Sequence, residues 1–163
     1  MTNYKFSGHE TFQCRHFWLK KGYDFLSNDY TFKSNESVVA LGVGKNMVAS
    51  ISHWLKVFGL TETVDESTKV TSRADVIFGA DGYDPYLEDR GTLFLLHHYL
   101  LTNQEFTLIY NLAFGEFRRS RIDLEFTAKQ LFEFVWRRLK KEGVEQRHSE
   151  NSLKNDVKVF LRM

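Results

Sequence analysis

The stretch that decides the fold is "LGVGKNMVASISHWLKVFGL", residues Leu41–Leu60. Its glycines and lysine suggest a phosphate-binding loop, but that motif, G-x-x-x-x-G-K-[ST], needs a glycine where Val39 stands and a hydroxyl where Asn46 stands. The dinucleotide pattern G-x-G-x-x-G also fails, because its third glycine would fall at Met47. The residues therefore argue against a nucleotide loop.

The same stretch fits two helices that are joined by a glycine turn. Asn35 is expected to cap a short helix over residues 36–41, and the glycine-rich residues 42–44 then supply a tight turn. Beyond the turn, apolar residues recur at steps of three, four and three, which is the spacing of one helix face. Gly59 is expected to end this second helix. The apolar stripe consists of Val48, Ile51, Leu55 and Phe58.

The opposite face of the second helix carries small or hydrogen-bonding groups and cations. Short polar side chains read base edges and cations meet phosphates, so such a face suits a recognition helix in a DNA groove. β-prone stretches at residues 60–64 and 69–71 predict a small hairpin, the wing of a winged helix. Protein contact, or a purely structural role, is the alternative for this unit. The residues predicted to contact nucleic acid here are Lys45, Asn46, Ser50, His53, Lys56 and Lys69.

Length and composition describe a globular chain. The 163 residues are 42% hydrophobic and 15% aromatic, which excludes a disordered chain and allows one large or two small domains. No apolar run reaches the roughly eighteen residues of a membrane span, and the polar start is no signal peptide. A lone cysteine, Cys14, forms no internal disulfide, so we expect a cytoplasmic protein without a membrane partner.

Charge is segregated along the chain although the net charge is only +1. Residues 1–60 carry +3, residues 61–116 carry −7 and residues 117–163 carry +5. This distribution predicts basic surfaces from both ends of the chain and an acidic middle, the alternative being solvated faces without a partner.

Further helices are expected outside the central stretch. One spans Thr11–Leu26, a short one is capped by Ser72, and Thr92 is expected to cap "LFLLHHYLLT". The near-continuous apolar character of this last helix predicts burial on most of its sides. The stretch "EFTLIYNLAF", residues 105–114, is compatible with either a helix or a strand.

The end of the chain repeats the helix-turn-helix pattern. Thr127 and Gln130 form a capping box, and Gly143 is expected to end a helix with Leu131, Val135 and Leu139 on one face. Ser149 is expected to cap the next helix, which turns an apolar face inward; that face consists of Leu153, Val157 and Phe160. The residues predicted to contact nucleic acid on its outer face are Lys154, Asn155, Lys158 and Arg162.

These patterns together predict a mainly α protein with a small β hairpin. The expected architecture is a winged helix-turn-helix with additional helices and a second helix-turn-helix-like unit at the C-terminus. We expect an N-terminal winged-helix domain over residues 1–90 and a helical domain over residues 91–163. No wing follows the last helix, so we expect a fragment of a longer protein; completion of the unit by packing elsewhere is the alternative.

Four stretches resemble a bacterial family catalogued as domain of unknown function 4007. They are "FSGHETFQCRHFWLKKGYD", "ALGVGKNMVASISHWLKVFGL", "GYDPYLEDRGTLFLLHHYL" and "SLKNDVKVFLRM". The chain departs from the family at Gln13 and Arg90, where the family tends to have proline. The resemblance implies a role beside bacterial DNA-modification and phage-defence genes, notably sulfur-transfer enzymes that make phosphorothioate DNA. It supplies no catalytic residues.

Two clusters have residue types found in metal sites. The first is His9, Glu10, Cys14 and His16, which lacks the second cysteine of common zinc sites. We expect residues 7–10 to form a structured loop packed against the winged helix. The second cluster is Asp84, Glu88 and Asp89, a possible magnesium site. Because no base, nucleophile or phosphate loop accompanies it, a loop-fixing role is expected. No catalytic residue, metal or cofactor is predicted.

Two classes of function fit these observations. The first is a DNA-binding winged-helix protein, not an enzyme, that acts on double-stranded DNA as the recognition or accessory subunit of a DNA-modification or phage-defence system. The second is a protein-interaction adaptor that docks a partner enzyme with the same helices. A metal-dependent nuclease or nucleotide-utilising enzyme is a third and weaker possibility.

Overall fold

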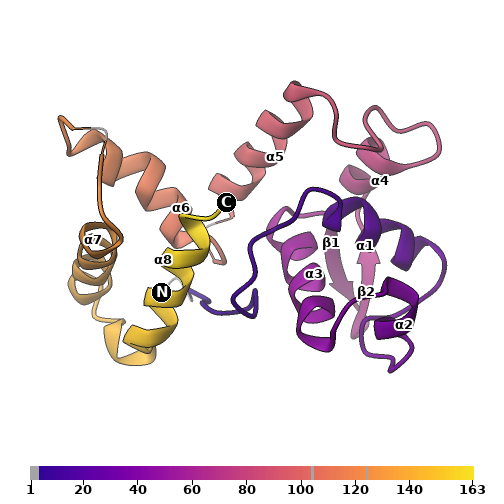
Figure 1. Cartoon of the computed structure of the whole chain (residues 1–163), viewed down its shortest axis with the longest axis horizontal. Coiled ribbons are helices and arrows are strands. Elements are labelled where there is room, and N and C mark those ends of the chain that lie inside the picture. The colour runs from indigo at the N-terminus through magenta and orange to yellow at the C-terminus, as the bar shows by residue number, and fades with distance from the viewer. Residues whose placement is uncertain (1–3, 104, 124) are drawn as a thin grey trace.

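The computed structural model describes residues 4–103, 105–123 and 125–163 and shows two lobes (Figure 1). The first lobe, residues 18–78, lies on the right of the figure, and the second lobe, which begins at residue 105, lies on the left. Helix α5 and the N-terminal segment both cross between them. The chain is mainly helical with one two-stranded antiparallel hairpin, which confirms the predicted fold class at this level.

The first lobe is built around its third helix. Three side chains of that helix, Ile51, Trp54 and Leu55, are at most 1% exposed and form the centre of its core. The hairpin follows directly, with Thr61 opposite Val70 in an antiparallel register. The elements in chain order are α1 (Trp18–Ser27), α2 (Ser37–Leu41), α3 (Lys45–Val57), β1 (Thr61–Val64), β2 (Ser67–Val70) and α4 (Ser72–Phe78).

Three predicted helix starts in this lobe are wrong. Ser72 is the first residue of α4, and Thr71, not Ser72, stands at its N-cap position without a side-chain cap. The first helix begins at Trp18, not Thr11, because residues before it contact other elements: the backbone carbonyl of Phe12 accepts a hydrogen bond from the Trp54 indole. Helix α2 begins at Ser37 with Glu36 at the N-cap position and no side-chain cap, so Asn35 does not cap it.

Helix α5 (Arg90–Thr102) joins the lobes and is less buried than its sequence predicts. Asp89, not Thr92, caps it, by accepting a hydrogen bond from the backbone N–H of Gly91. The expectation of burial on most sides is wrong, because only two of its side chains are buried. Leu96 and Leu100 are the buried ones, while Leu93, Phe94 and Leu95 are 44%, 75% and 41% exposed.

The second lobe is entirely helical within the described residues. The ambiguous stretch 105–114 proves helical from Leu108 onward, and its α-helix leads into a turn of π-helix. The Thr127–Gln130 capping box is confirmed, as is the Ser149 cap, whose hydroxyl accepts from the Asn151 N–H. The elements are α6 (Leu108–Leu112), the π-helical turn Ala113–Phe117, α7 (Ala128–Lys141), a 3₁₀ turn at Glu145–Arg147 and α8 (Glu150–Phe160).

Each lobe has its own hydrophobic core, and each core also contains residues from outside that lobe. Leu131, Val135 and Leu139 of α7 are fully buried in the second core, as predicted. Tyr4, from the start of the chain, packs in this second core, whereas Leu96 of α5 packs in the first. The predicted division into residues 1–90 and 91–163 stays a prediction.

Candidate nucleic-acid interface

The turn between α2 and α3 exposes the beginning of α3. Gly42 ends α2 with a φ of 59°, a left-handed conformation that glycine adopts without strain. Gly44 then starts α3 from an extended conformation. Lys45, Asn46 and Ala49 are all exposed in the first two turns of the helix. These turns therefore present one cation, one amide and one small side chain to solvent.

Ser50 does not belong to this exposed face, which corrects the prediction. Its side chain is 0% exposed, and its hydroxyl has no hydrogen-bond partner within the described part of the chain. The apolar side of α3 is wider than a stripe at steps of three and four, because Trp54 is also buried beside Ile51 and Leu55. The hydroxyl of Ser50 is thereby enclosed and does not reach a base edge.

His53 is covered by residues from outside the first lobe. A Cβ added at Gly8 would collide with its imidazole, so the N-terminal segment lies directly against it. Phe106, which precedes α6, packs edge-on at a ring distance of 5.9 Å. Burial, together with the nearby His9 and Lys56, lowers the pKa of His53 to about 4. His53 is therefore neutral at pH 7 and offers no cation to a phosphate.

The last turn of α3 is likewise in contact with the segment that follows α5. The side-chain amide of Asn103 donates to the backbone carbonyl of Val57 at 2.9 Å. Lys56 is exposed, and its ammonium lies 5.4 Å from the ring centre of Phe106. Only the first half of α3 is thus free on its outer side, and Lys56 lies at the edge of the covered half.

The hairpin beside α3 is more acidic than basic. Lys69 on β2 is exposed and pairs across the strands with Glu62 on β1. The turn residues Asp65 and Glu66 both have positive φ, and the Glu66 carbonyl accepts a hydrogen bond from the Lys33 ammonium at 3.0 Å. With three carboxylates and one lysine, the hairpin repels a phosphate backbone more than it attracts one.

Helix α8 carries Lys154, Asn155 and Lys158 on an open face, and Arg162 follows in the turn after the helix. Lys154 lies 3.2 Å from Glu150 and 5.2 Å from the ring centre of Phe132, so its charge is partly compensated. Lys158 and Arg162 are exposed, and neither has an ion-pair partner in the described ranges. Asn155 is exposed as well. The predicted contact residues of α3 and α8 lie in different lobes, with the N-terminal segment between them (Figure 1).

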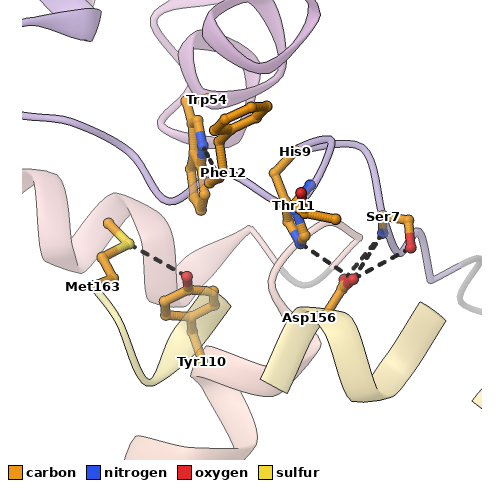
Figure 2. A network of polar contacts seen from close by, with 8 residues as sticks. All are labelled: Ser7, His9, Thr11, Phe12, Trp54, Tyr110, Asp156 and Met163. Atoms are coloured by element: carbon orange, nitrogen blue, oxygen red, sulfur yellow. Dashed lines mark hydrogen bonds and ion pairs between the residues drawn. The ribbon is translucent and has the colours of Figure 1, made fainter. Parts of the chain in front are cut away.

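A buried contact joins the N-terminal segment to α8, and it was not predicted. Figure 2 shows Asp156 pointing from α8 toward Ser7 and His9. The backbone N–H of Ser7 donates to both carboxylate oxygens at 3.1 Å, and its hydroxyl donates to one at 3.4 Å. His9 Nε2 lies 3.1 Å from Asp156 Oδ1, at ion-pair distance but outside hydrogen-bond alignment. We call this Ser7–His9–Asp156 group the clamp.

The clamp also reaches the first lobe. His9 Nδ1 accepts a hydrogen bond from the Thr11 N–H, which places the imidazole proton on Nε2, facing Asp156. The His9 ring stacks on Trp54 of α3 with centres 6.1 Å apart. Although serine, histidine and aspartate meet here, the serine hydroxyl donates to the carboxylate and not to the imidazole. The group is therefore not a nucleophile with its base.

Strain in the N-terminal segment agrees with a role for the clamp in holding it. Ser7, Glu10 and Thr11 have φ values of 64°, 48° and 68°, which are unfavourable for residues with a Cβ. Such conformations persist where the surroundings fix them. The predicted packing of residues 7–10 against the first lobe is found. The contact of Ser7 with Asp156 of α8 joins residues 149 positions apart, so no local sequence pattern indicated this contact.

Neither predicted metal-type cluster forms a converged ligand set. Among the described residues, no group of three or more His, Cys, Asp or Glu side chains is arranged to hold a metal ion. Burial raises the pKa of the Cys14 thiol, which keeps it protonated. The carboxylate of Asp84 instead accepts the backbone N–H groups of Glu88 and Asp89 at 2.8 and 3.1 Å, which fixes the loop before α5.

Three comparisons relate the chain to known proteins. The family model described as "Protein of unknown function (DUF4007)" matches residues 6–163. Two solved structures of SspB are similar, with TM-scores of 0.81 and 0.80 and 30% and 32% identity, the second being bound to magnesium ion. The match covers 98% of this chain but 49% and 48% of those chains, so the chain spans about half their length. Comparison with curated proteins gave no match. None of the helices described here has the length and apolar character needed to cross a membrane.

Proposed function

The chain belongs to the DUF4007 family of proteins of unknown function, and on that premise we propose that it is a DNA-binding protein of winged helix-turn-helix type. In this proposal it serves as the recognition or accessory subunit of a bacterial DNA-modification or phage-defence system. The link to phosphorothioation comes from the family resemblance in its sequence. The protein works in the cytoplasm, on double-stranded DNA and beside the enzymes of that system.

One observation carries the proposal, namely the exposed first half of α3. In helix-turn-helix proteins the N-terminal residues of the recognition helix contact base edges in the major groove. Here those positions hold Lys45, Asn46 and Ala49, all exposed after the Gly42 turn. An amide suits adenine and a cation suits guanine or a phosphate. The order α1, α2, α3, β1, β2 is also the order of a winged helix.

We propose a smaller set of DNA-contacting residues than the sequence alone suggests. Lys45 and Asn46 are proposed as base or phosphate contacts, while Lys154, Asn155, Lys158 and Arg162 form a second, phosphate-binding face on α8. His53 and Ser50 are left out of the proposed set, because the lowered pKa of His53 leaves it uncharged and the Ser50 side chain is buried. Lys69 is expected to contribute little because it sits among the hairpin carboxylates.

The experiment that tests the proposal is a binding titration with duplex DNA at several salt concentrations. The Lys45→Glu, Lys56→Glu double variant replaces two exposed cations of α3, and Lys21→Glu on α1 is the matched exposed control. We expect the double variant to lose at least roughly tenfold in affinity, since it removes cations and adds repulsion. The control is expected to stay near the unmodified protein. Equal binding by a folded double variant would refute the proposal.

An adaptor role is the second candidate, and the exposed apolar side chains of α5 favour it. Contiguous exposed apolar surface marks protein-interaction sites in soluble proteins. An adaptor would bind a partner protein without salt-dependent DNA affinity, so the same titration separates the two functions. A metal-dependent enzyme stays third. One similar SspB structure is bound to magnesium ion, but here Asp84, the buried carboxylate of the acidic loop, is engaged by backbone N–H groups.

A further inference from the structure

The sequence and the surroundings of α5 disagree. Its run "LFLLHHYLL" is apolar on nearly every side, which is the pattern of a helix buried all round. Yet Leu93, Phe94 and Leu95 are 44%, 75% and 41% exposed. Exposed apolar side chains lower the solubility of a protein, because burying them against another surface lowers the free energy. The sequence therefore indicates that another surface covers α5.

A groove lies along one side of this helix. Its volume is about 450 Å³, within the range of about 300–1,000 Å³ that is typical of binding pockets. It runs between α5, the start of α1, the π-helical turn and the end of α8. Its floor is made by buried apolar residues such as Leu19, Leu96 and Leu100. Its mouth exposes three large apolar side chains: Leu93, Phe114 and Met163, at 44%, 51% and 51%.

The polar groups of the groove are mainly basic. Arg15, His16 and His97 line it, and none of its lining residues is a carboxylate. The carboxylates of the nearby acidic loop do not line the groove. Asp84 accepts backbone N–H groups of its own loop, and Asp89 accepts the Gly91 N–H at the start of α5. An occupant with carboxylates beside apolar side chains would thus be complementary in charge and in surface.

We propose that this groove binds an acidic amphipathic helix of a partner protein. A helix fits because the groove is open at its mouth, where the side chains of Leu93, Phe114 and Met163 are exposed. Binding of an apolar helix face in a groove between helices is a common recognition mode. The carboxylates of the partner lie at the Arg15, His16 and His97 rim. This site is separate from the DNA contacts and does not rest on them.

The test selects peptides that bind the groove, and it does not require the identity of the partner protein. A displayed library of random peptides of about 16 residues, or four helical turns, is panned on the whole chain. We expect enriched peptides with apolar residues at i, i+3, i+4 and i+7 and a net negative charge. Their dissociation constants are expected on the order of micromolar, increasing with salt.

Matched variants locate the site. Leu93→Asp places a carboxylate at the mouth, and Val39→Asp places one on an exposed apolar residue of α2, outside the groove. We expect the first to weaken peptide binding at least roughly tenfold and the second by less than about twofold. Phe114→Asp, from the opposite wall, repeats the test if Leu93→Asp fails to fold. Arg15→Glu should weaken binding of the acidic peptides.

Three outcomes would overturn the proposal. They are the enrichment of no peptide, the enrichment of basic peptides, and the enrichment of peptides whose binding is unchanged by both Leu93→Asp and Phe114→Asp. Because the readout is peptide binding, each outcome leaves the DNA titration of the proposed function unaffected.

Discussion

The chain contains two helical hairpins of similar plan, α2–α3 and α7–α8, and they differ in what their second helices leave free. In α3 the second half is covered by Gly8 and Phe106, and only Lys45, Asn46 and Ala49 are freely exposed in its first turns. In α8 the outer face stays open along its length, with Lys158 and Arg162 unpaired in the described structure. One hairpin thus presents a short, mixed surface, and the other a row of cations.

If both hairpins contact DNA, this difference suggests that they make different kinds of contact. Short polar groups at the start of a helix suit base reading, while a row of cations suits phosphate contact, which positions the protein without reading sequence. The clamp is the cause of this difference. The N-terminal segment, which the clamp holds through Asp156 on the inner side of α8, covers the second half of α3. The following predictions test the comparison, from the largest expected effect to the smallest.

Removing the clamp carboxylate should have the largest effect. Asp156→Ala leaves the Ser7 N–H and the His9 imidazole buried without their partner, and we expect the free energy of unfolding to fall by about 2–4 kcal/mol. Denaturant unfolding measures this change. Glu150→Ala, on the exposed side of the same helix, is the control and should cost less than about 1 kcal/mol. Equal losses would show that the clamp does not link the lobes.

Acidification should lower the stability of the folded protein, because His53 is buried under the N-terminal segment and resists protonation. Its pKa is lowered from 6.5 to about 4 in the folded protein, mainly by burial, so the unfolded chain binds the proton more readily. The stabilisation is therefore complete above about pH 6.5 and decreases as the pH falls toward 4, by up to about 3 kcal/mol. Unfolding measured across this range should show a flatter pH dependence in His53→Gln. His16→Gln, at an exposed histidine, should leave the slope unchanged, and an unchanged slope in both variants would contradict the prediction.

The cation row of α8 should appear in the salt dependence of DNA binding. If Lys154, Lys158 and Arg162 all meet phosphates, replacing them with Ala should flatten the slope of log affinity against log salt by about two to three. The decrease in slope should be nearer two if Lys154 keeps its ion pair with Glu150 and does not contact a phosphate. Sequence preference should hardly change. The control replaces three α7 lysines, Lys129, Lys140 and Lys141, and an equal flattening there would mean that only total charge matters.

The hairpin should contribute least. Lys69→Ala removes one cation from a surface that also holds Glu62, Asp65 and Glu66, so we expect DNA affinity to change by less than about twofold. Anisotropy titration at low salt gives the most sensitive measurement. A tenfold loss would show that the hairpin approaches DNA as a wing despite its acidic turn.

Local features of this fold could be predicted from sequence, and the reason is physical. The Thr127–Gln130 box, the Ser149 cap and the Gly42 turn each depend on residues within a few positions of one another. The hairpin and the buried stripe of α7 follow from alternation and from helical spacing for the same reason. These features identified the exposed start of α3 as the candidate site.

Features that depend on distant residues were missed. Ser50 is enclosed because Trp54 widens the buried side of α3, which its own small, polar character does not indicate. Helix α1 starts late because Phe12 bonds to Trp54, 42 residues away. The burial predicted for α5 fails within this chain because periodicity reports that a face is apolar but not what covers it.

The clamp also has a consequence for the order in which the chain folds. Ser7 and Asp156 are 149 residues apart, so Ser7 has no carboxylate partner until α8 has been made. Until then Ser7 lacks the contact that holds its left-handed conformation, and the segment over His53 is anchored at its Trp54 end but not at α8. We therefore expect the first lobe to form early with α3 open on its outer side, and to be closed late by a contact of very long sequence separation.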